Sequence, residues 1–180
     1  MKNTLIIAAA AAMFISSCKD AETPQPENES ELITTVRLDL VNQSDTTDVS
    51  TFYFRDNDGP GGLDPLQWDT VRLAAGTTYD LTIALLDEST LPNGDISAEV
   101  EEEGTDHQLF FNIDPASLLT VDYNDSDDNG DPVGLVNVAT TSSTGAGTLT
   151  VILKHQPGIK DGNQNTGETD VEVEFVLEVL

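Results

Sequence analysis

From Leu32 to the carboxyl terminus, apolar and polar side chains alternate with a period of two residues, which is typical of strands rather than helices. In the last segment the apolar positions share one parity and the acidic positions share the other. The apolar positions are Val171, Val173, Phe175, Leu177 and Val179, and the acidic positions are Asp170, Glu172, Glu174 and Glu178. The pattern predicts a strand with one buried face and one solvated face.

The same alternation recurs along the chain and is interrupted by turn residues. It covers the segments 32–40, 49–56, 66–74, 78–86, 107–113 and 148–155. Asp95 can cap a short helix that ends at Gly104, and Asp114 before Pro115 marks a second helical turn. We therefore predict an all-β fold, a single antiparallel β-sandwich of Ig-like or jelly-roll-like type, with about eight strands and one or two short helical turns.

The first 18 residues have a different pattern. Lys2 precedes an apolar run from Leu5 to Ile15, which is shorter than the roughly 20 residues of a membrane-spanning helix. A basic start, a short apolar run and small residues after it are the features of a secretory signal peptide. Ile15-Ser16-Ser17-Cys18 resembles the bacterial lipobox. This resemblance implies cleavage before Cys18 and acylation of that residue.

The following segment is acidic, contains proline and lacks apolar periodicity, so it reads as a disordered tether. Its start, Lys19-Asp20-Ala21-Glu22, resembles the acidic export signal of Bacteroidota surface lipoproteins. The predicted organisation is a signal peptide at 1–17, a tether at 18–31 with lipidated Cys18, and a sandwich domain at 32–180. We expect the protein in the outer membrane, anchored by lipid on the periplasmic or cell-surface side.

The charge of the chain limits its partners. It has seven basic and 33 acidic residues and a net charge of −26. Such a surface repels nucleic acid and keeps a protein soluble, so we expect a monomer with no nucleic-acid partner. Cys18 is the only cysteine, so after its acylation no disulfide can form, and stability must come from packing or bound ions.

The loop 125–131 carries oxygen-bearing side chains at alternate positions. These are Asp125, Asp127, Asn129 and Asp131. The spacing matches the first half of a calcium-binding loop, although Val136 stands where an EF-hand has its bidentate glutamate. Asp, Asn and Gly also dominate ordinary turns, so a calcium site and a polar hairpin are both open here. The loops 56–59 and 161–165 have the same two interpretations.

The two histidines, His107 and His155, both have the parity of an apolar face, and each lies near a strand end. If their strands are neighbours, the imidazoles can meet at the rim of the core. Together with a carboxylate such as Glu103 or Asp106 they would suit zinc or copper. The alternative is a pair of half-buried histidines that are hydrogen-bonded to the backbone.

The sequence offers little for catalysis. No serine lies in a G-x-S-x-G motif, and the carboxylates are too numerous to single out a glycosidase pair. The rings of Tyr53, Trp68 and Tyr79 are either core residues or a sugar-stacking platform.

We expect a non-enzymatic binding or structural module with a small-molecule, glycan or protein ligand. The alternative is a surface lipoprotein that binds calcium or a transition metal. A carbohydrate-active enzyme or carbohydrate-binding module comes third.

Several short stretches in residues 31–180 carry a family resemblance. They are Glu31 to Val36, the Asp/Gly loop at 56–62, Thr77 to Tyr79, Leu85 to Glu88, Glu101 to Glu103, His107 to Phe111, Asn129 to Gly134, Gly147 to His155 and Gly167 to Asp170. They are similar to a family of small Bacteroidota surface lipoproteins of unknown function. Members are often described as type 1 periplasmic-binding-fold proteins, a fold with two α/β lobes, whereas the pattern here predicts strands.

Overall fold

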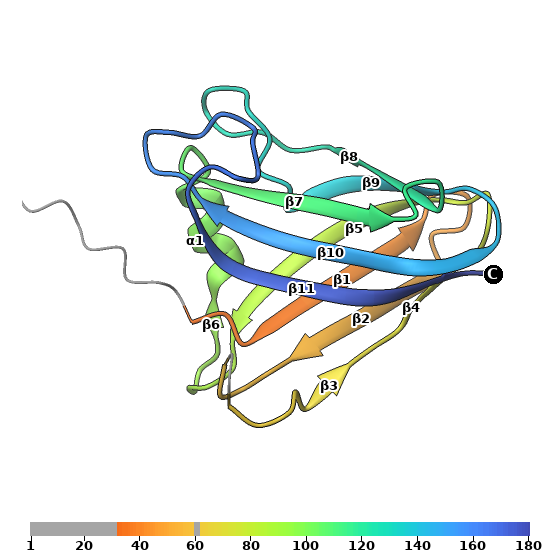
Figure 1. Cartoon of the computed structure of the whole chain (residues 1–180), viewed down its shortest axis with the longest axis horizontal. Helices are drawn as coiled ribbons and strands as arrows, with labels where there is room; N and C mark the ends of the chain where they lie inside the picture. Colours follow the sequence, from red (N-terminus) through yellow and green to blue (C-terminus); the bar gives the residue numbers. More distant parts are fainter. Residues whose placement is uncertain (1–31, 60–61) are drawn as a thin grey trace, which may run out of the picture.

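The computed structural model describes residues 32–59 and 62–180, and these residues form two packed β-sheets (Figure 1). The predicted signal peptide, Cys18 and tether lie outside the described residues. The all-β prediction is confirmed, because the described part of the chain is a mainly antiparallel β-sandwich with one short helix. Within these two ranges, no helix is long and apolar enough to cross a membrane.

The larger sheet has the strand order β3-β2-β1-β5-β9-β8, and β6 pairs with β5. Its strands are β1 (Thr35–Asn42), β2 (Val49–Arg55), β3 (Gln67–Trp68), β5 (Thr78–Asp87), β6 (Gly94–Asp95), β8 (Leu119–Tyr123) and β9 (Val136–Thr141). All of its pairings are antiparallel. The single helix, α1 (Ile96–Glu102), follows β6, and the carboxylate of Asp95 accepts a hydrogen bond from the backbone N–H of Ala98 as its N-cap.

The smaller sheet has the order β4-β11-β10-β7. Its strands are β4 (Val71–Leu73), β7 (His107–Asp114), β10 (Gly145–His155) and β11 (Glu168–Val179). The short β4 runs parallel to β11, and the other pairings are antiparallel. Eight of the strands in the described residues have five or more residues, a number that agrees with the predicted total of about eight, and the other three have two or three.

The core lies between the sheets and is built from the inward-facing parity of each strand. Leu38 on β1, Leu81 and Leu85 on β5, and Phe175 on β11 are almost completely buried. On β11 the predicted alternation is confirmed, because Val173, Phe175 and Leu177 are buried while Glu172 and Glu174 are exposed. Burial of this apolar area is the main favourable contribution to folding.

One flank of the sandwich is closed by an aromatic pair. Trp68 on β3 packs edge-on against Phe54 with ring centroids 5.5 Å apart. Its indole N–H also donates to the carbonyl oxygen of Glu174, 2.9 Å away on the other sheet. Trp68 therefore joins two segments that are 106 residues apart in the sequence.

Two details differ from the sequence prediction. The strands β8 and β9 carry no clear apolar alternation and were not anticipated. The segment after Asp114 is a turn before β8 rather than a second helical turn, and the N–H of Leu118 donates to the carbonyl of Pro115.

Truncation of the core on β11 tests this architecture. We expect Phe175→Ala to lower the free energy of unfolding by about 3–5 kcal/mol, because the ring is fully buried between the sheets. The control is Val176→Ala on the same strand, whose side chain is 51% exposed and should contribute little. Urea unfolding followed by circular dichroism measures both changes, and equal effects would contradict the burial of this face.

Candidate metal centre

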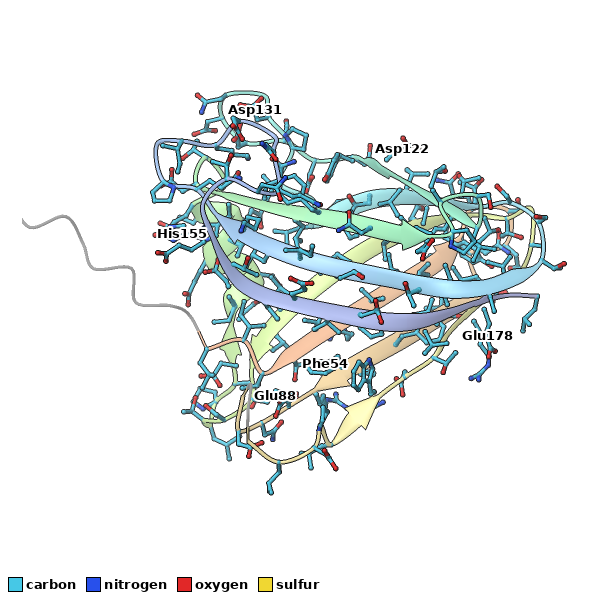
Figure 2. All side chains as sticks on the ribbon, in the orientation of Figure 1. Phe54, Glu88, Asp122, Asp131, His155 and Glu178 are labelled. Atoms are coloured by element: carbon cyan, nitrogen blue, oxygen red, sulfur yellow. The ribbon has the colours of Figure 1, made fainter. Side chains whose placement is uncertain are left out.

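The two histidines meet where three strands of the smaller sheet end. The pairing of β7 with β10 places His107 directly opposite His155, and the pairing of β10 with β11 places His155 opposite Glu168. Figure 2 shows His155 at the end of β10, beside α1. The residue that follows α1, Glu103, is its C-cap. Strand register and the end of the helix therefore bring these side chains together.

The imidazoles of His107 and His155 are stacked, with ring centroids 4.6 Å apart and an angle of 13° between the ring planes. Together with the carboxylate of Glu103, they offer three ligand atoms that all lie within 4.8 Å of one another. Among residues 32–59 and 62–180, this is the one group of three or more His, Cys, Asp or Glu side chains with such spacing. The described structure therefore contains a Glu/His/His group with the composition of a metal site.

His107 is held in one orientation. It is 3% exposed, and its Nδ1 lies 3.2 Å from the backbone carbonyl oxygen of Glu103. A carbonyl oxygen only accepts, so this hydrogen bond requires the proton on Nδ1 and leaves the lone pair of the neutral ring on Nε2. Burial lowers the pKa of His107 and favours that neutral form. Metal-binding histidines commonly donate their second N–H to a carbonyl in this way.

Asp170 completes the surroundings of His107. Its Oδ2 lies 3.9 Å from Nε2 of His107, and the Asp170 side chain is 6% exposed. The alternation predicted that Asp170 faces water, and this expectation is wrong. The register of β10 and β11 shifts between Leu153 and Lys154, so Asp170 is the extra residue of a bulge. A bulge re-aims one side chain, and here the carboxylate turns inward.

This carboxylate is unusual for a second reason. Its Oδ2 is buried and has no hydrogen-bond partner within the part of the chain that the structure describes. Burial raises the pKa of Asp170, since an ionised carboxylate is poorly solvated there. A buried oxygen without a partner costs free energy, and a bound water or ion is the usual explanation.

The β10–β11 connection is fixed next to the histidines. The carbonyl of Asp106 accepts from the N–H of Gln156 at 2.6 Å, and its Oδ1 accepts from Gly158 N–H at 3.2 Å. Gly167 has a φ of +74°, and a Cβ there would collide with the carbonyl oxygen of His155, so only glycine fits. Asp106, the other carboxylate named with the histidines, therefore anchors the loop, and Glu103 is the one in the group.

The stacked arrangement also limits how an ion can bind. The lone pair of an imidazole lies in the plane of its ring, and the planes of two rings stacked 4.6 Å apart at an angle of 13° do not meet within bonding distance of the rings. Both rings can bind one ion only after one of them turns. His155 is only partly buried, whereas His107 is enclosed and hydrogen-bonded to the carbonyl of Glu103. His155 is therefore the ring that must turn.

The predicted calcium loop has other contacts for its carboxylates. Asp125 accepts hydrogen bonds from the N–H groups of Gly134 and Val136, at 2.7 and 2.9 Å. Oδ1 of Asp127 accepts from the N–H groups of Asn129 and Asp131. Asn129 and Asp131 are exposed. These bonds describe a tight polar turn, and calcium binding at Asp125, Asp127, Asn129 and Asp131 stays a prediction.

Asp127 is also paired with a cation of the chain itself. Its Oδ2 lies 2.8 Å from the ammonium of Lys160, which also donates to the carbonyl of Gly104. The Lys160 and Asp127 side chains are 4% and 1% exposed. Burial acts to raise the pKa of Asp127, but Lys160 and the two N–H donors hold it below its usual range.

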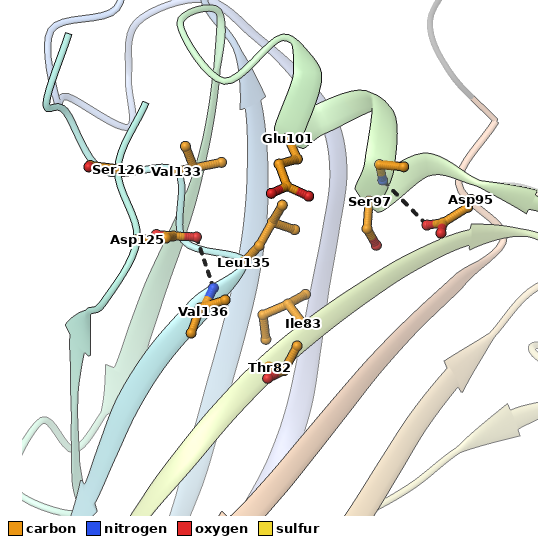
Figure 3. A pocket seen from close by; sticks show the side chains of 11 residues that line it. Thr82, Ile83, Asp95, Ser97, Glu101, Asp125, Ser126, Val133, Leu135 and Val136 are labelled. Carbon is orange, nitrogen blue, oxygen red and sulfur yellow. Dashed lines mark hydrogen bonds between the residues drawn. The ribbon is translucent and has the colours of Figure 1, made fainter. Parts of the chain in front are cut away.

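A small pocket of about 280 Å³ lies between α1 and the strands β5 and β9 (Figure 3). Ile83 and Leu135 are among its apolar residues, and Asp95, Glu101 and Asp125 are its carboxylates. Asp95 and Asp125 make the hydrogen bonds described above, which hold the helix start and the loop in place. Two of the three carboxylates in the pocket wall, Asp95 and Asp125, therefore already have structural partners.

The three rings considered for sugar stacking do not form a platform. Tyr79 is 3% exposed, and its hydroxyl accepts from the N–H of Ala74. Trp68 pairs with Phe54 in the sheet, so Tyr53, the next residue along β2, points to the opposite face. The guanidinium carbon of Arg55 lies over the ring of Tyr53, 3.9 Å from the centroid of that ring.

Comparisons with known proteins add no family to this picture: no protein-family model matches the chain, and no curated protein or solved structure matches it.

The buried pair of Asp127 and Lys160 gives a prediction about stability. Asp127→Asn leaves the Lys160 ammonium buried without a counter-charge, and breaking such a pair costs about 3–5 kcal/mol. The lowered pKa of Asp127 means that its contribution is present above pH 3.8 and is lost as the pH falls through the folded-state value. Urea unfolding at neutral and acid pH measures both effects.

Asp128→Asn is the matched control, since Asp128 is the next residue and is exposed. It makes the same chemical change at the surface and should leave stability nearly unchanged. Equal stability of the two variants at neutral pH would contradict a buried ion pair.

Proposed function

We propose that the protein is a lipid-anchored, non-enzymatic module of the outer membrane whose sandwich domain binds one divalent transition-metal ion through His107, His155 and Glu103. The observation that carries the metal-binding part is the convergence of two imidazoles and a carboxylate on the ends of β7, β10 and α1. Imidazole and carboxylate together suit zinc, copper, nickel or iron better than calcium, which prefers oxygen ligands alone.

The charge of the chain supports this function. With a net charge of −26, the protein attracts cations and raises their concentration near its surface. Its other carboxylates give only weak, unselective attraction, whereas the two histidines supply nitrogen ligands. Selectivity for a transition metal over the more abundant calcium and magnesium would therefore depend on His107 and His155.

The anchoring part of the proposal depends on the amino-terminal sequence. Residues 15–18 resemble a lipobox, and the acidic residues after Cys18 resemble a surface-export signal. A protein held at the outer membrane by lipid is exposed to extracytoplasmic metal ions, so the anchor and the metal centre are compatible.

Metal binding is tested by titration of the metal-free protein with Zn²⁺ at pH 7.5 against a chromophoric chelator. We expect one equivalent to bind. Glu103→Gln and His155→Gln should each weaken Zn²⁺ binding more than the loss of a residue that only orients a ligand, which costs about 10–100-fold in affinity. Glu102→Gln is the control, because Glu102 is exposed on the same helix and loses the same charge. Absence of stoichiometric binding, or an equal loss in the control, would overturn the proposal.

Anchoring is tested separately with Cys18→Ala. The natural protein should fractionate with membranes, because two or more acyl chains hold a protein firmly. The variant should lack both the acyl groups and cleavage before residue 18, which mass spectrometry of the amino terminus measures. A variant that still carries a lipidated, processed amino terminus would show that the lipobox assignment is wrong.

A further inference from the structure

We infer that Asp170 is a fourth ligand of this metal centre, and that the ion is held in a closed site that joins α1 to three strands. The inference rests on the proposed metal-binding function and adds to it a ligand and a role. It starts from the unpartnered, buried Oδ2 of Asp170, which lies 3.9 Å from the Nε2 of His107.

The direction of the two side chains agrees with a shared ion. Because Nδ1 of His107 donates to the Glu103 carbonyl, the lone pair that faces Asp170 is on Nε2. Two ligands on a tetrahedral zinc ion, each about 2.0–2.1 Å from the metal, are about 3.4 Å apart. The observed separation is about half an ångström longer. A small inward movement therefore suffices for an ion between His107 and Asp170. Asp170 lies outside the group of three whose ligand atoms are within 4.8 Å of one another, so it must also move toward Glu103 and His155 when the ion binds.

The fold explains why Asp170 is in this place. A regular β11 would direct residue 170 to the same face as Glu172, which is exposed. The bulge opposite Leu153 and Lys154 turns the carboxylate inward and leaves its oxygen unpartnered. Bulges recur beside functional sites because they re-aim one side chain. A bulge that only ended the strand would not require a buried acid.

The number of ligands decides the role of the ion. Structural zinc sites have four protein ligands, whereas catalytic sites keep one position for water or substrate. Glu103, His107, His155 and Asp170 supply four. They come from the end of α1 and from β7, β10 and β11, so a bound ion would stabilise the folded domain by cross-linking these elements.

The test compares Asp170→Asn with the natural protein, with and without metal. In chelator the variant should melt no lower than the natural protein, because a buried charge has been replaced by a neutral group of the same shape. With Zn²⁺ in excess it should melt lower, and its affinity for Zn²⁺ should fall by about 100-fold, the upper end of what an outer-shell partner costs. Glu172→Gln, on the exposed face of β11, is the control and should retain the natural affinity.

Cobalt(II) distinguishes a ligand from a residue that only orients His107. The natural protein loaded with Co²⁺ should show the intense visible absorption of a four-coordinate tetrahedral ion. In Asp170→Asn this absorption should weaken or shift as water enters the coordination sphere.

The outcomes separate the two proposals. If the natural protein binds no Zn²⁺, the proposed function fails. If it binds Zn²⁺ and Asp170→Asn binds equally tightly with an unchanged cobalt spectrum, the function stands and the assignment of Asp170 is overturned. In that case the unpartnered oxygen of Asp170 is hydrogen-bonded to a structural water.

Discussion

The antiparallel pairing of β10 with both of its neighbours is the constraint on which the candidate centre depends. β10 is an inner strand of the smaller sheet, and its register with β7 and β11 brings residues from three distant parts of the chain into one row. A slip of one residue would move every side chain to the opposite face. The buried core residues Leu149, Val151 and Leu153 prevent such a slip, so packing of the sandwich also fixes the position of His155.

Much of the fold could be predicted because most strands obey the alternation of apolar and polar residues. β9 does not, and this is why it was missed. Its inward-facing positions are Asn137, Ala139 and Thr141, while Val136 is 41% exposed. The buried hydroxyl of Thr141 has a partner that only the folded chain supplies, because it donates to the carbonyl of Ala74, 67 residues away, whereas Asn137 donates locally to the carbonyl of Gly134. No short segment of sequence contains that information.

In the candidate centre, too, some residues follow from the local sequence and others only from the folded structure. The parity of His107 and His155 places two imidazoles at the rim of the core if their strands are neighbours. It leaves open a metal site with a carboxylate such as Glu103 or Asp106, or a pair hydrogen-bonded to the backbone. The structure brings His107, His155 and Glu103 together, and it also shows the bond from His107 to the backbone carbonyl of Glu103. Asp170 could not be found in this way, since its parity with Glu172 and Glu174 indicates an exposed position. Its inward turn depends on a register shift against another strand, which is a property of the pairing and not of the local sequence.

The contact between Lys160 and Asp127 has a consequence for how the 125–131 turn responds to its surroundings. A free cation can be diluted, exchanged or removed by a competing chelator. The ammonium of Lys160 is covalently part of the chain, so its effective concentration at Asp127 is fixed by the fold. The position of Asp127 in this turn should therefore depend little on the concentration of calcium and magnesium in the solution. Other acids of the described residues also pair with a base of the chain, but the Lys160–Asp127 pair is almost completely buried and is therefore shielded from the ions of the surrounding solution.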